Sequence, residues 1–420
     1  MEFIYNIGIR LYAFCAWVAS FFSSKINKMI KGQRQTLSLI REGIGQDDRV
    51  VWFHAASLGE FEQGRPLMER VRKNHPEFKI LLTFFSPSGY EVRKNYDKAD
   101  VVCYLPFDTW RNVKKFLHAA HPEIAVFIKY EFWYFYLSRL RSSGAKIYSV
   151  SSIFRENQFY FKYKFGTKML RQFDHICVQN ESSRKLLAEK DITCVTVTGD
   201  TRFDRVVDIR HASSDLPLVE RFRDGHHVFI AGSSWQPDEE IYLAYFKNHP
   251  DWKLVIAPHE IHQERIEKLM KHLEGRKVIR YTEVVDKYNA GKKDEAKDDV
   301  DNADVLIVDC FGKLSSIYRY CEIAVVGGGF GAGIHNVPEA AVYGIPVLFG
   351  PNNRKFREAQ ALKKCEGAFE YTDLQSFTLI MDRLIDEPDY RKAVGERAGA
   401  YINNNAGAAD KCYKIIFGKV

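Results

Sequence analysis

The sequence predicts an α/β protein of two doubly wound, Rossmann-like domains that face each other across a cleft, preceded by an apolar N-terminal helix. From residue 50 onward, short apolar runs alternate with amphipathic segments, as in parallel βαβ units. The runs form two series, separated by the polar segment Thr198–Pro217. A chain of 420 residues is also too long for one ordinary core. We therefore expect an N-terminal anchor segment over residues 1–34, a first Rossmann-like domain over 35–205 and a second over 206–420.

Each series contains candidate strands that are short and largely apolar, as expected for a parallel sheet covered on both faces. In the first series these are Val50–Phe53, Ile80–Phe84, Val101–Tyr104, Ile124–Ile128, Lys146–Val150 and His175–Gln179. In the second they are Val228–Ala231, Lys253–Ala257, Val278–Arg280, Val305–Asp309, Ile323–Val326 and Pro346–Phe349. The segment Lys287–Asp304 is dense in charge and poor in apolar residues, so we expect a solvated loop there.

The N-terminus differs from the rest of the chain. Leu11–Phe22 is uncharged and apolar, but a full span needs about 20 such residues, so the segment predicts a marginal transmembrane helix or an in-plane anchor. The basic residues that follow favour the cytoplasmic face and anionic headgroups; they are Lys25, Lys28, Lys31, Arg34 and Arg41. A buried N-terminal helix is the alternative. A cleaved signal peptide is disfavoured, because no obvious small-residue cleavage site follows.

Composition narrows the compartment and the class of protein. The chain is 46% hydrophobic and 27% charged, which is ordinary for a folded protein, and its net charge of +7 suits any anionic partner without choosing one. Its eight cysteines are scattered without a C-x-x-C pair, so we expect no zinc site and no disulfide framework. A reducing compartment is therefore favoured.

The glycine-rich segment Gly327–Ala341 is the strongest candidate for a ligand site. It follows an apolar run and places five glycines in seven residues, including Gly328 and Gly329, before His335 at the start of a helix. Glycines allow a ligand to approach the backbone closely, and helix starts favour anions. The spacing fits neither a dinucleotide fingerprint nor a Walker A loop. The alternative is that the glycines only pack a strand tightly against a helix.

Two carboxylates follow candidate strands of the first series. Glu60 comes after Val50–Phe53 at the start of an amphipathic helix, where it could cap the helix or act as a general base. The helix terminus would lower its pKa, so burial or a neighbouring acid would have to counter this effect. Glu131 follows Ile124–Ile128, and its aromatic neighbours make a buried structural role equally plausible.

Three further strand exits in the second series carry small or polar residues, as binding sites of doubly wound sheets do. They contain Gly232 with Ser233, Pro258 with His259, and Phe311, Gly312 and Lys313. Together with the glycine-rich segment, they predict a nucleotide site at one edge of the second sheet.

The chain resembles the 3-deoxy-D-manno-octulosonic acid (Kdo) transferases along most of its length. The residues that carry the resemblance are His54–Glu60, Glu131–Trp133, Gly199–Asp204, Ala257–Pro258, Gly312–Leu314, His335–Asn336 with Glu339, and Phe349–Pro351. The resemblance implies a B-type glycosyltransferase fold and inverting transfer of Kdo from CMP-Kdo to a tetra-acylated lipid A precursor. It further implies action at the cytoplasmic face of the bacterial inner membrane, with no nucleic acid partner. A B-type glycosyltransferase or epimerase that uses a UDP-sugar is the alternative.

The resemblance also implies roles for particular residues. Glu60 would be the base, aided by Glu131 and Arg202. CMP contacts would fall on Pro258, His259, Phe311, Gly312, Lys313, Asn336, Val337, Pro338 and Glu339. The chain departs from the family at His259, where Arg is usual, at Lys313, where an acid is usual, and at Arg202, where Lys is usual. No cofactor or metal is implied, and the sequence shows no D-x-D motif at a strand end. The glycine-rich segment, the helix start and His335 would stabilise the leaving CMP.

Overall fold

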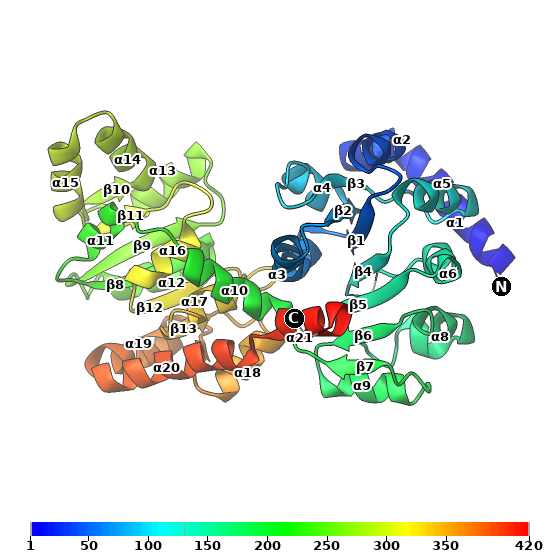
Figure 1. Cartoon of the computed structure of the whole chain (residues 1–420). Coiled ribbons are helices and arrows are strands. Elements are labelled where there is room, and N and C mark those ends of the chain that lie inside the picture. The colour runs from blue at the N-terminus through cyan, green and yellow to red at the C-terminus, as the bar shows by residue number, and fades with distance from the viewer. Residues whose placement is uncertain (1, 130, 419–420) are drawn as a thin grey trace. The chain divides into compact units, whose positions relative to one another are not determined.

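The computed structural model describes residues 2–129 and 131–418 and divides the chain into two compact α/β units (Figure 1). The first unit comprises Met1–Arg205 with Asn405–Val420, and the second comprises Val206–Asn404. The division after Arg205 falls within the polar segment Thr198–Pro217, inside helix α10 (Thr201–Ala212).

The first unit is built on a parallel seven-stranded sheet with the order β3-β2-β1-β4-β5-β6-β7. Its strands are β1 (Arg49–Ala55), β2 (Phe78–Phe84), β3 (Val101–Tyr104), β4 (Ile124–Ile128), β5 (Lys146–Ser152), β6 (His175–Val178) and β7 (Val195–Val197). The chain reverses its direction of travel across the sheet between β1 and β4. Such a switch point is where doubly wound sheets place their ligands.

Helices cover both faces of this sheet, because successive strand residues point to opposite faces and both sets are apolar. One face packs mainly against α2 (Ser24–Gly43), α5 (Trp110–Ala120), α6 (Tyr134–Ser143) and α8 (Lys164–Leu170), and the other against α3 (Leu58–Asn74) and α21 (Ala408–Phe417). The remaining helices of the unit are α1 (Glu2–Ala19), α4 (Pro87–Arg93), α7 (Phe159–Lys162) and α9 (Glu181–Ala188). Strand β1 shows the alternation, since Trp52 joins the first cluster and Phe53 the second.

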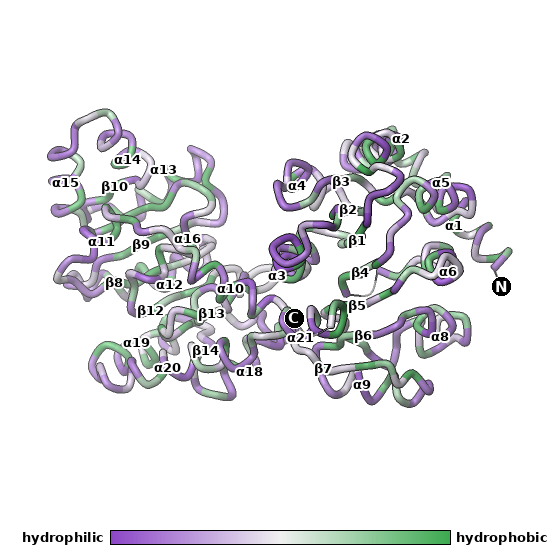
Figure 2. Tube along the Cα trace, in the orientation of Figure 1, coloured by the Kyte–Doolittle hydropathy of each residue, from purple (hydrophilic) through white to green (hydrophobic). Residues whose placement is uncertain are grey.

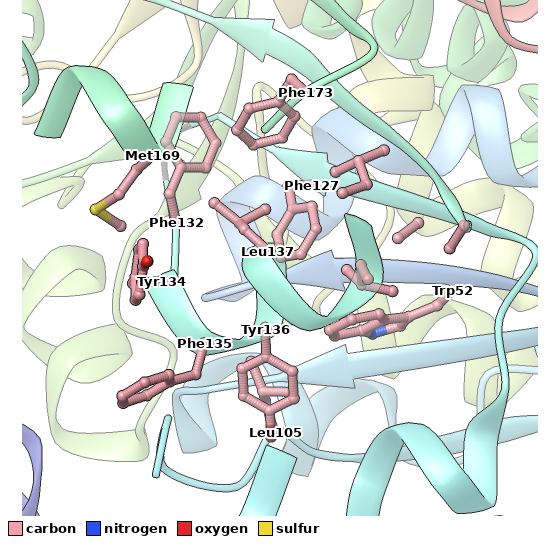
Figure 3. Packing of buried hydrophobic residues seen from close by; sticks show 14 of the residues in the cluster. Trp52, Leu105, Phe127, Phe132, Tyr134, Phe135, Tyr136, Leu137, Met169 and Phe173 are labelled. Atoms are coloured by element: carbon pink, nitrogen blue, oxygen red, sulfur yellow. The ribbon is translucent and has the colours of Figure 1, made fainter. Parts of the chain in front are cut away.

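Aromatic side chains dominate the first of these clusters (Figure 3). The ring centroid of Trp52 lies 5.3 Å from that of Phe127 on β4 and 5.5 Å from that of Tyr136 on α6. The indole N–H of Trp52 donates to Oγ1 of Thr83 on β2 at 2.8 Å. The packing of this core therefore fixes α6, whose N-terminus follows Glu131.

The N-terminal segment is part of this unit. Helix α1 packs Ile9 and Ala16 against a small cluster with Met29 of α2, and Thr36 of α2 donates to the carbonyl oxygen of Tyr104 at 2.7 Å. No helix within the described residues is long and apolar enough to cross a membrane. On the inner face of α1, Ala16 is buried, and Tyr5, Ile9 and Ala13 are half-buried. Its outer face remains apolar and exposed, with Phe3, Ile4, Ile7, Leu11, Phe14, Trp17, Val18, Phe21 and Phe22 on or just after the helix.

The C-terminal helix α21 packs in the first unit, whereas we predicted from the sequence that the second domain extends over 206–420. Asp204 accepts hydrogen bonds from the backbone amides of Gly407, Ala408 and Ala409, and so caps the start of α21. Cys412, Tyr413 and Ile416 join the cluster beneath α3. A ten-residue helix carries no signal of its partner in its own sequence, so this placement was missed.

The second unit repeats the architecture with a parallel seven-stranded sheet of order β10-β11-β9-β8-β12-β13-β14. Its strands are β8 (His227–Ser234), β9 (Trp252–Pro258), β10 (Val278–Arg280), β11 (Val305–Ile307), β12 (Ile323–Val326), β13 (Val347–Phe349) and β14 (Ala368–Glu370). Its helices are α11 (Pro217–Arg223), α12 (Gln236–Phe246), α13 (Gln263–His272), α14 (Tyr281–Asn289), α15 (Lys293–Asp301), α16 (Leu314–Ile317), α17 (Val337–Ala341), α18 (Arg357–Lys364), α19 (Leu374–Asp386) and α20 (Pro388–Asn405), with a 3₁₀ turn at Tyr318–Tyr320. The switch point lies between β8 and β12.

The prediction of a loop over Lys287–Asp304 was wrong. The segment contains the end of α14 and all of α15, which is largely hydrophilic (Figure 2). Ala296 and Val300, four residues apart, are buried on one face of α15, which packs against α14. Lys287 and Asp299 join the two helices through an ion pair of 2.7 Å. Two apolar residues four positions apart therefore anchor a helix in a segment whose high charge density had predicted a loop.

Candidate active site

Glu60 and Glu131 follow the two strands at the switch point of the first sheet. Strand β1 pairs directly with β4, and each carboxylate lies a few residues beyond the carboxyl end of its strand. The structure therefore brings together the two acids that the sequence singled out, and their charges interact.

Glu60 is the third residue of α3, and its side chain is only 9% exposed. Oε2 accepts the backbone N–H groups of Ala56 at 2.6 Å and Ser57 at 3.2 Å, which completes a capping box. Glu60 is thus a helix cap, and Oε1 has no hydrogen-bond partner among the described residues. Burial raises the pKa of Glu60 despite the nearby charge of Lys129 and the two N–H groups, which lower it. A carboxylate with one free oxygen and a raised pKa suits general-base chemistry.

Glu131 lies in the loop between β4 and α6. Burial, reinforced by the negative charge of Glu60, raises the pKa of Glu131 to about 7. Because two neighbouring carboxylates resist ionising together, the negative charge of Glu60 favours the protonated form of Glu131. The same loop holds Lys129 in the left-handed region, at φ 62°. The hydroxyl of Ser149 donates to the Lys129 carbonyl oxygen at 3.1 Å and helps to hold this conformation.

Arg202 is linked to the helix of Glu60 through two side chains. Its Nε donates to Oδ2 of Asp200 at 2.9 Å, and the Asp200 Oδ1 accepts Nε2 of Gln63 at 3.0 Å. Gln63 is buried one turn after Glu60 on α3. The bond from Gln63 to Asp200 thus positions the segment that carries Arg202.

In the second unit, the glycine-rich segment leaves β12 at the switch point beside β8. Gly232 and Ser233 stand at the end of β8, where a bulge places Ser233 at φ 52°. A Cβ on Gly232 would lie 2.0 Å from the hydroxyl oxygen of Tyr318, and one on Gly329 would lie 2.5 Å from the Cα of Gly350. Gly328 adopts φ 93°. Tight packing therefore accounts for Gly232 and Gly329, and the turn accounts for Gly328.

A buried carboxylate that the sequence did not single out by itself holds this segment in place. Asp238 of α12 accepts the backbone N–H of Trp235 at 3.0 Å and that of Gly328 at 3.1 Å through the same Oδ2. Burial raises the pKa of Asp238 in spite of these bonds. Asp238 thereby ties the exit of β8 to the exit of β12.

His259 and His335 meet at this edge of the sheet. Their rings stack with centroids 4.4 Å apart, and His259 also stacks on Trp235 at 4.7 Å. Pro258 ends β9 directly before His259, in register with Ser234 of β8. Trp235 was absent from the predicted site, because nothing in the local sequence links it to a histidine 100 residues away.

The other predicted CMP contacts lie at the exits of β12 and β11, which β8 and β9 separate in the sheet. Asn336 Nδ2 donates to Oε1 of Glu339 at 2.6 Å, and Val337 and Pro338 are buried in the first turn of α17. Phe311, Gly312 and Lys313 follow β11. Phe311 is 80% exposed and Gly312 adopts φ 80°. No group of three or more potential metal ligands comes together within residues 2–129 and 131–418.

Comparisons with known proteins bear on this arrangement. The sequence model of the 3-deoxy-D-manno-octulosonic-acid transferases matches residues 31–205. The chain is 24% identical over 378 residues to the 3-deoxy-D-manno-octulosonic acid transferase of Rickettsia felis, covering 87% of this chain and 78% of that protein. It is 26% identical over 336 residues to the Aquifex aeolicus protein of the same name, covering 78% and 83%. The resemblance to the Kdo transferases that the sequence indicated is therefore confirmed over most of the chain.

The relatives that this chain resembles are named as glycosyltransferases of the Kdo transferase kind, and solved structures agree on the fold. The UDP-N-acetylglucosamine 2-epimerase of Neisseria meningitidis, solved with UDP-N-acetylglucosamine bound, superposes with a TM-score of 0.59 at 12% identity. The match covers 88% of this chain and 100% of that one. The two Rossmann-like units are therefore those of the B-type glycosyltransferase fold, as the sequence predicted.

Proposed function

We propose that this protein moves Kdo from CMP-Kdo to a tetra-acylated lipid A precursor, with inversion at the anomeric carbon. The observation that carries the proposal is the pair of carboxylates at the switch point of the first sheet, the buried Glu60 and the half-buried Glu131. We propose Kdo as the sugar because the matching family model and the relatives are named as Kdo transferases.

In this proposal Glu60 takes the proton of an acceptor hydroxyl. The hydroxyl oxygen forms a bond to the anomeric carbon of Kdo while the bond from that carbon to the CMP phosphate oxygen breaks, and CMP leaves with the bonding electrons. Oε1 of Glu60 is the oxygen available for the proton, since Oε2 caps α3. Glu131 stays protonated in part near pH 7, and it can donate a hydrogen bond to the sugar or the acceptor. Arg202, held by Asp200, supplies positive charge.

The second unit would hold the donor. The strand exits that carry His259, Phe311–Lys313 and Asn336–Glu339 supply ring, backbone and amide contacts for a nucleotide. His335 and the glycine-rich segment would take the developing charge on the leaving phosphate. We propose that the reaction needs no metal or other cofactor, so activity should survive treatment with EDTA.

We further propose that the protein works on the cytoplasmic face of the inner membrane, held there by α1 and the basic face of α2. The outward side of α1 is largely apolar, interrupted by the exposed Arg10, and solvent-exposed Lys25, Lys28, Lys31 and Arg34 follow on α2. An exposed apolar helix beside a basic surface is typical of in-plane attachment to anionic lipid.

One experiment tests the proposed reaction directly. Purified full-length protein in detergent is incubated with CMP-Kdo and the tetra-acylated precursor, and the lipid product is weighed by mass spectrometry. A mass increase of one or more Kdo units, with release of CMP, is expected. In a parallel binding assay CMP should displace labelled donor better than UDP does. Stronger displacement by UDP would favour the alternative of a UDP-sugar enzyme.

A further inference from the structure

The rings of Trp235, His259 and His335 lie together where strands of the second sheet end. The distances and angles between them allow only one arrangement. The indole Nε1 of Trp235 lies 3.1 Å from Nε2 of His335. Both rings stack on His259 with interplanar angles of 25° and 22°. A His259 ring inserted between them would hold the two nitrogens too far apart to bond. Trp235 and His335 therefore lie edge to edge on the same face of His259.

The bond between these rings fixes the protonation of His335. An indole N–H can only donate, so Nε2 of His335 has to accept and carries no proton. The neutral ring then bears its proton on Nδ1, which is the less common tautomer of a histidine in water. Burial and the neighbouring His259 both lower the pKa of His335, in keeping with a neutral ring.

The backbone holds the same ring in place. The N–H of His335 donates to the carbonyl oxygen of Gly327 at 3.1 Å. A Cβ on Gly328 would lie 3.0 Å from Cδ2 of the His335 ring, so the glycine there makes room for the ring. In the described part of the chain, Nδ1 of His335 has no hydrogen-bond partner. Its N–H is therefore left to donate to a ligand.

We propose that Trp235 is a positioning residue that holds His335 as an Nδ1–H donor toward an anionic oxygen of the donor substrate. The inference rests on the proposed function, in which this edge of the sheet binds a nucleotide-activated acidic sugar. Two oxygens of such a donor share this chemistry, the nucleotide phosphate and the sugar carboxylate. With its proton on Nε2 instead, His335 would turn a lone pair toward either anion and repel it.

The decisive variant is Trp235→Phe, which keeps an aromatic ring to stack on His259 but removes the indole N–H. Its matched control is Trp252→Phe, because Trp252 also stacks on a histidine, His227, elsewhere in the same sheet. The tautomer of His335 is measured by NMR, from the ¹⁵N chemical shifts and couplings of full-length protein labelled in its histidine rings. The signal of His335 is identified as the one that is missing in His335→Gln. Wild type and Trp252→Phe should show Nδ1–H, and Trp235→Phe should shift toward Nε2–H.

Binding then identifies the anion. Loss of one hydrogen bond to a charged group should weaken affinity about tenfold. If the phosphate is the partner, Trp235→Phe loses this factor for CMP and keeps the wild-type affinity for cytidine. If the carboxylate is the partner, CMP affinity is unchanged and the KM for CMP-Kdo rises about tenfold.

Two results would overturn the proposal. One is the finding that His335 of the wild-type protein carries its proton on Nε2. This measurement is made on the wild type alone, so it does not depend on whether a variant folds. The other is a tautomer change in Trp235→Phe that leaves CMP affinity and the KM for CMP-Kdo untouched. Wild-type protein with the Nδ1–H tautomer but no affinity for CMP would instead refute the proposed function and the ligand assigned to His335, while leaving the bond between the two rings intact.

Discussion

The hydroxyl of Tyr5 donates a 2.7 Å hydrogen bond to Oδ2 of Asp108 and thereby joins the N-terminal helix to the helix that follows Glu131. Asp108 is buried and also accepts the backbone N–H groups of Phe135 and Tyr136 in the first turn of α6. Burial, helped by the Glu131 carboxylate, raises the pKa of Tyr12 on the same N-terminal helix. Helix α1 therefore both carries the exposed apolar face and supports the loop of a candidate catalytic acid.

Tyr5→Phe should destabilise the first unit and lower the turnover rate. It removes the donor to Asp108 and the acceptor of the Tyr134 amide, a buried loss of about 1–3 kcal/mol. Urea unfolding and product formation would measure the two effects. Tyr12→Phe is the control, because no hydrogen bond of the Tyr12 hydroxyl occurs among the described residues. Equal unfolding midpoints for both variants would mean that Tyr5 does not hold α1 to α6.

The pH dependence of stability should report on Asp108. Burial raises the pKa of Asp108 to about 7, whereas an unfolded aspartate ionises near pH ~4. Between these values the unfolded state binds fewer protons than the folded state, so stability falls as pH rises from about 4 to 7. Asp108→Asn should flatten this decline in urea titrations at several pH values, leaving a residual slope from Glu131. A slope identical to that of wild type would show that Asp108 ionises normally.

Glu60→Gln should abolish Kdo transfer while the fold and CMP affinity remain. The amide keeps an acceptor oxygen for the N–H groups of Ala56 and Ser57, so the cap on α3 survives while the base is lost. Loss of a general base typically costs about 10²–10⁴-fold in rate. Turnover under saturating substrates would measure this, with the unfolding midpoint and CMP titration as controls. Activity within a few fold of wild type would remove Glu60 from the mechanism.

Most strands could be predicted from the sequence because they are buried on both faces and read as apolar runs. The two that were missed, β7 and β14, are three-residue edge strands with partly exposed side chains. Their local pattern does not differ from that of a loop.

Only those residues of the candidate site that follow a predicted strand could be found from the sequence. Glu60 and Glu131 stood out because each follows an apolar run, and parallel strands bring such positions to one edge. Partners from distant segments left no such signal. Gln63 meets Asp200 across 137 positions, and Trp235 meets His335 across 100. These pairings depend on the order of strands in the sheet, which one sequence does not encode in any local pattern.

Asn336→Ala and Glu339→Ala should each weaken CMP binding, and their effects should not add. The 2.6 Å bond from Asn336 Nδ2 to Glu339 Oε1 means that either change already disturbs the other side chain. A coupling energy of about 0.5–3 kcal/mol is expected for such neighbours. Calorimetry on both single variants and the double variant would measure it, with Asn403→Ala on α20 as control. Unchanged CMP affinity in both single variants would place the donor site elsewhere.

Charge reversal at Lys162 and Lys164 should loosen binding to anionic vesicles. Ile153–Phe173 interleaves aromatic with basic residues, and the structure places part of this segment in the core and part at the surface. Phe165, Met169 and Phe173 are buried in the core, as Figure 3 shows for Met169 and Phe173. Phe159 and Tyr163 are 46% and 58% exposed. The exposed side chains could therefore still contact lipid beside α1.

Each basic residue near an anionic surface contributes about 1 kcal/mol, so reversing two should weaken vesicle binding at least tenfold at low salt. The effect should shrink as salt rises, because the interaction is screened. The full-length chain is the proper background, since α1 and α2 pack into the first unit and their removal would disturb its core. Lys364→Glu with Lys392→Glu changes the net charge equally, at exposed positions of the second unit, and serves as the control. Equal loss of binding in the two double variants would mean that net charge alone acts, and that Lys162 and Lys164 mark no membrane-facing surface.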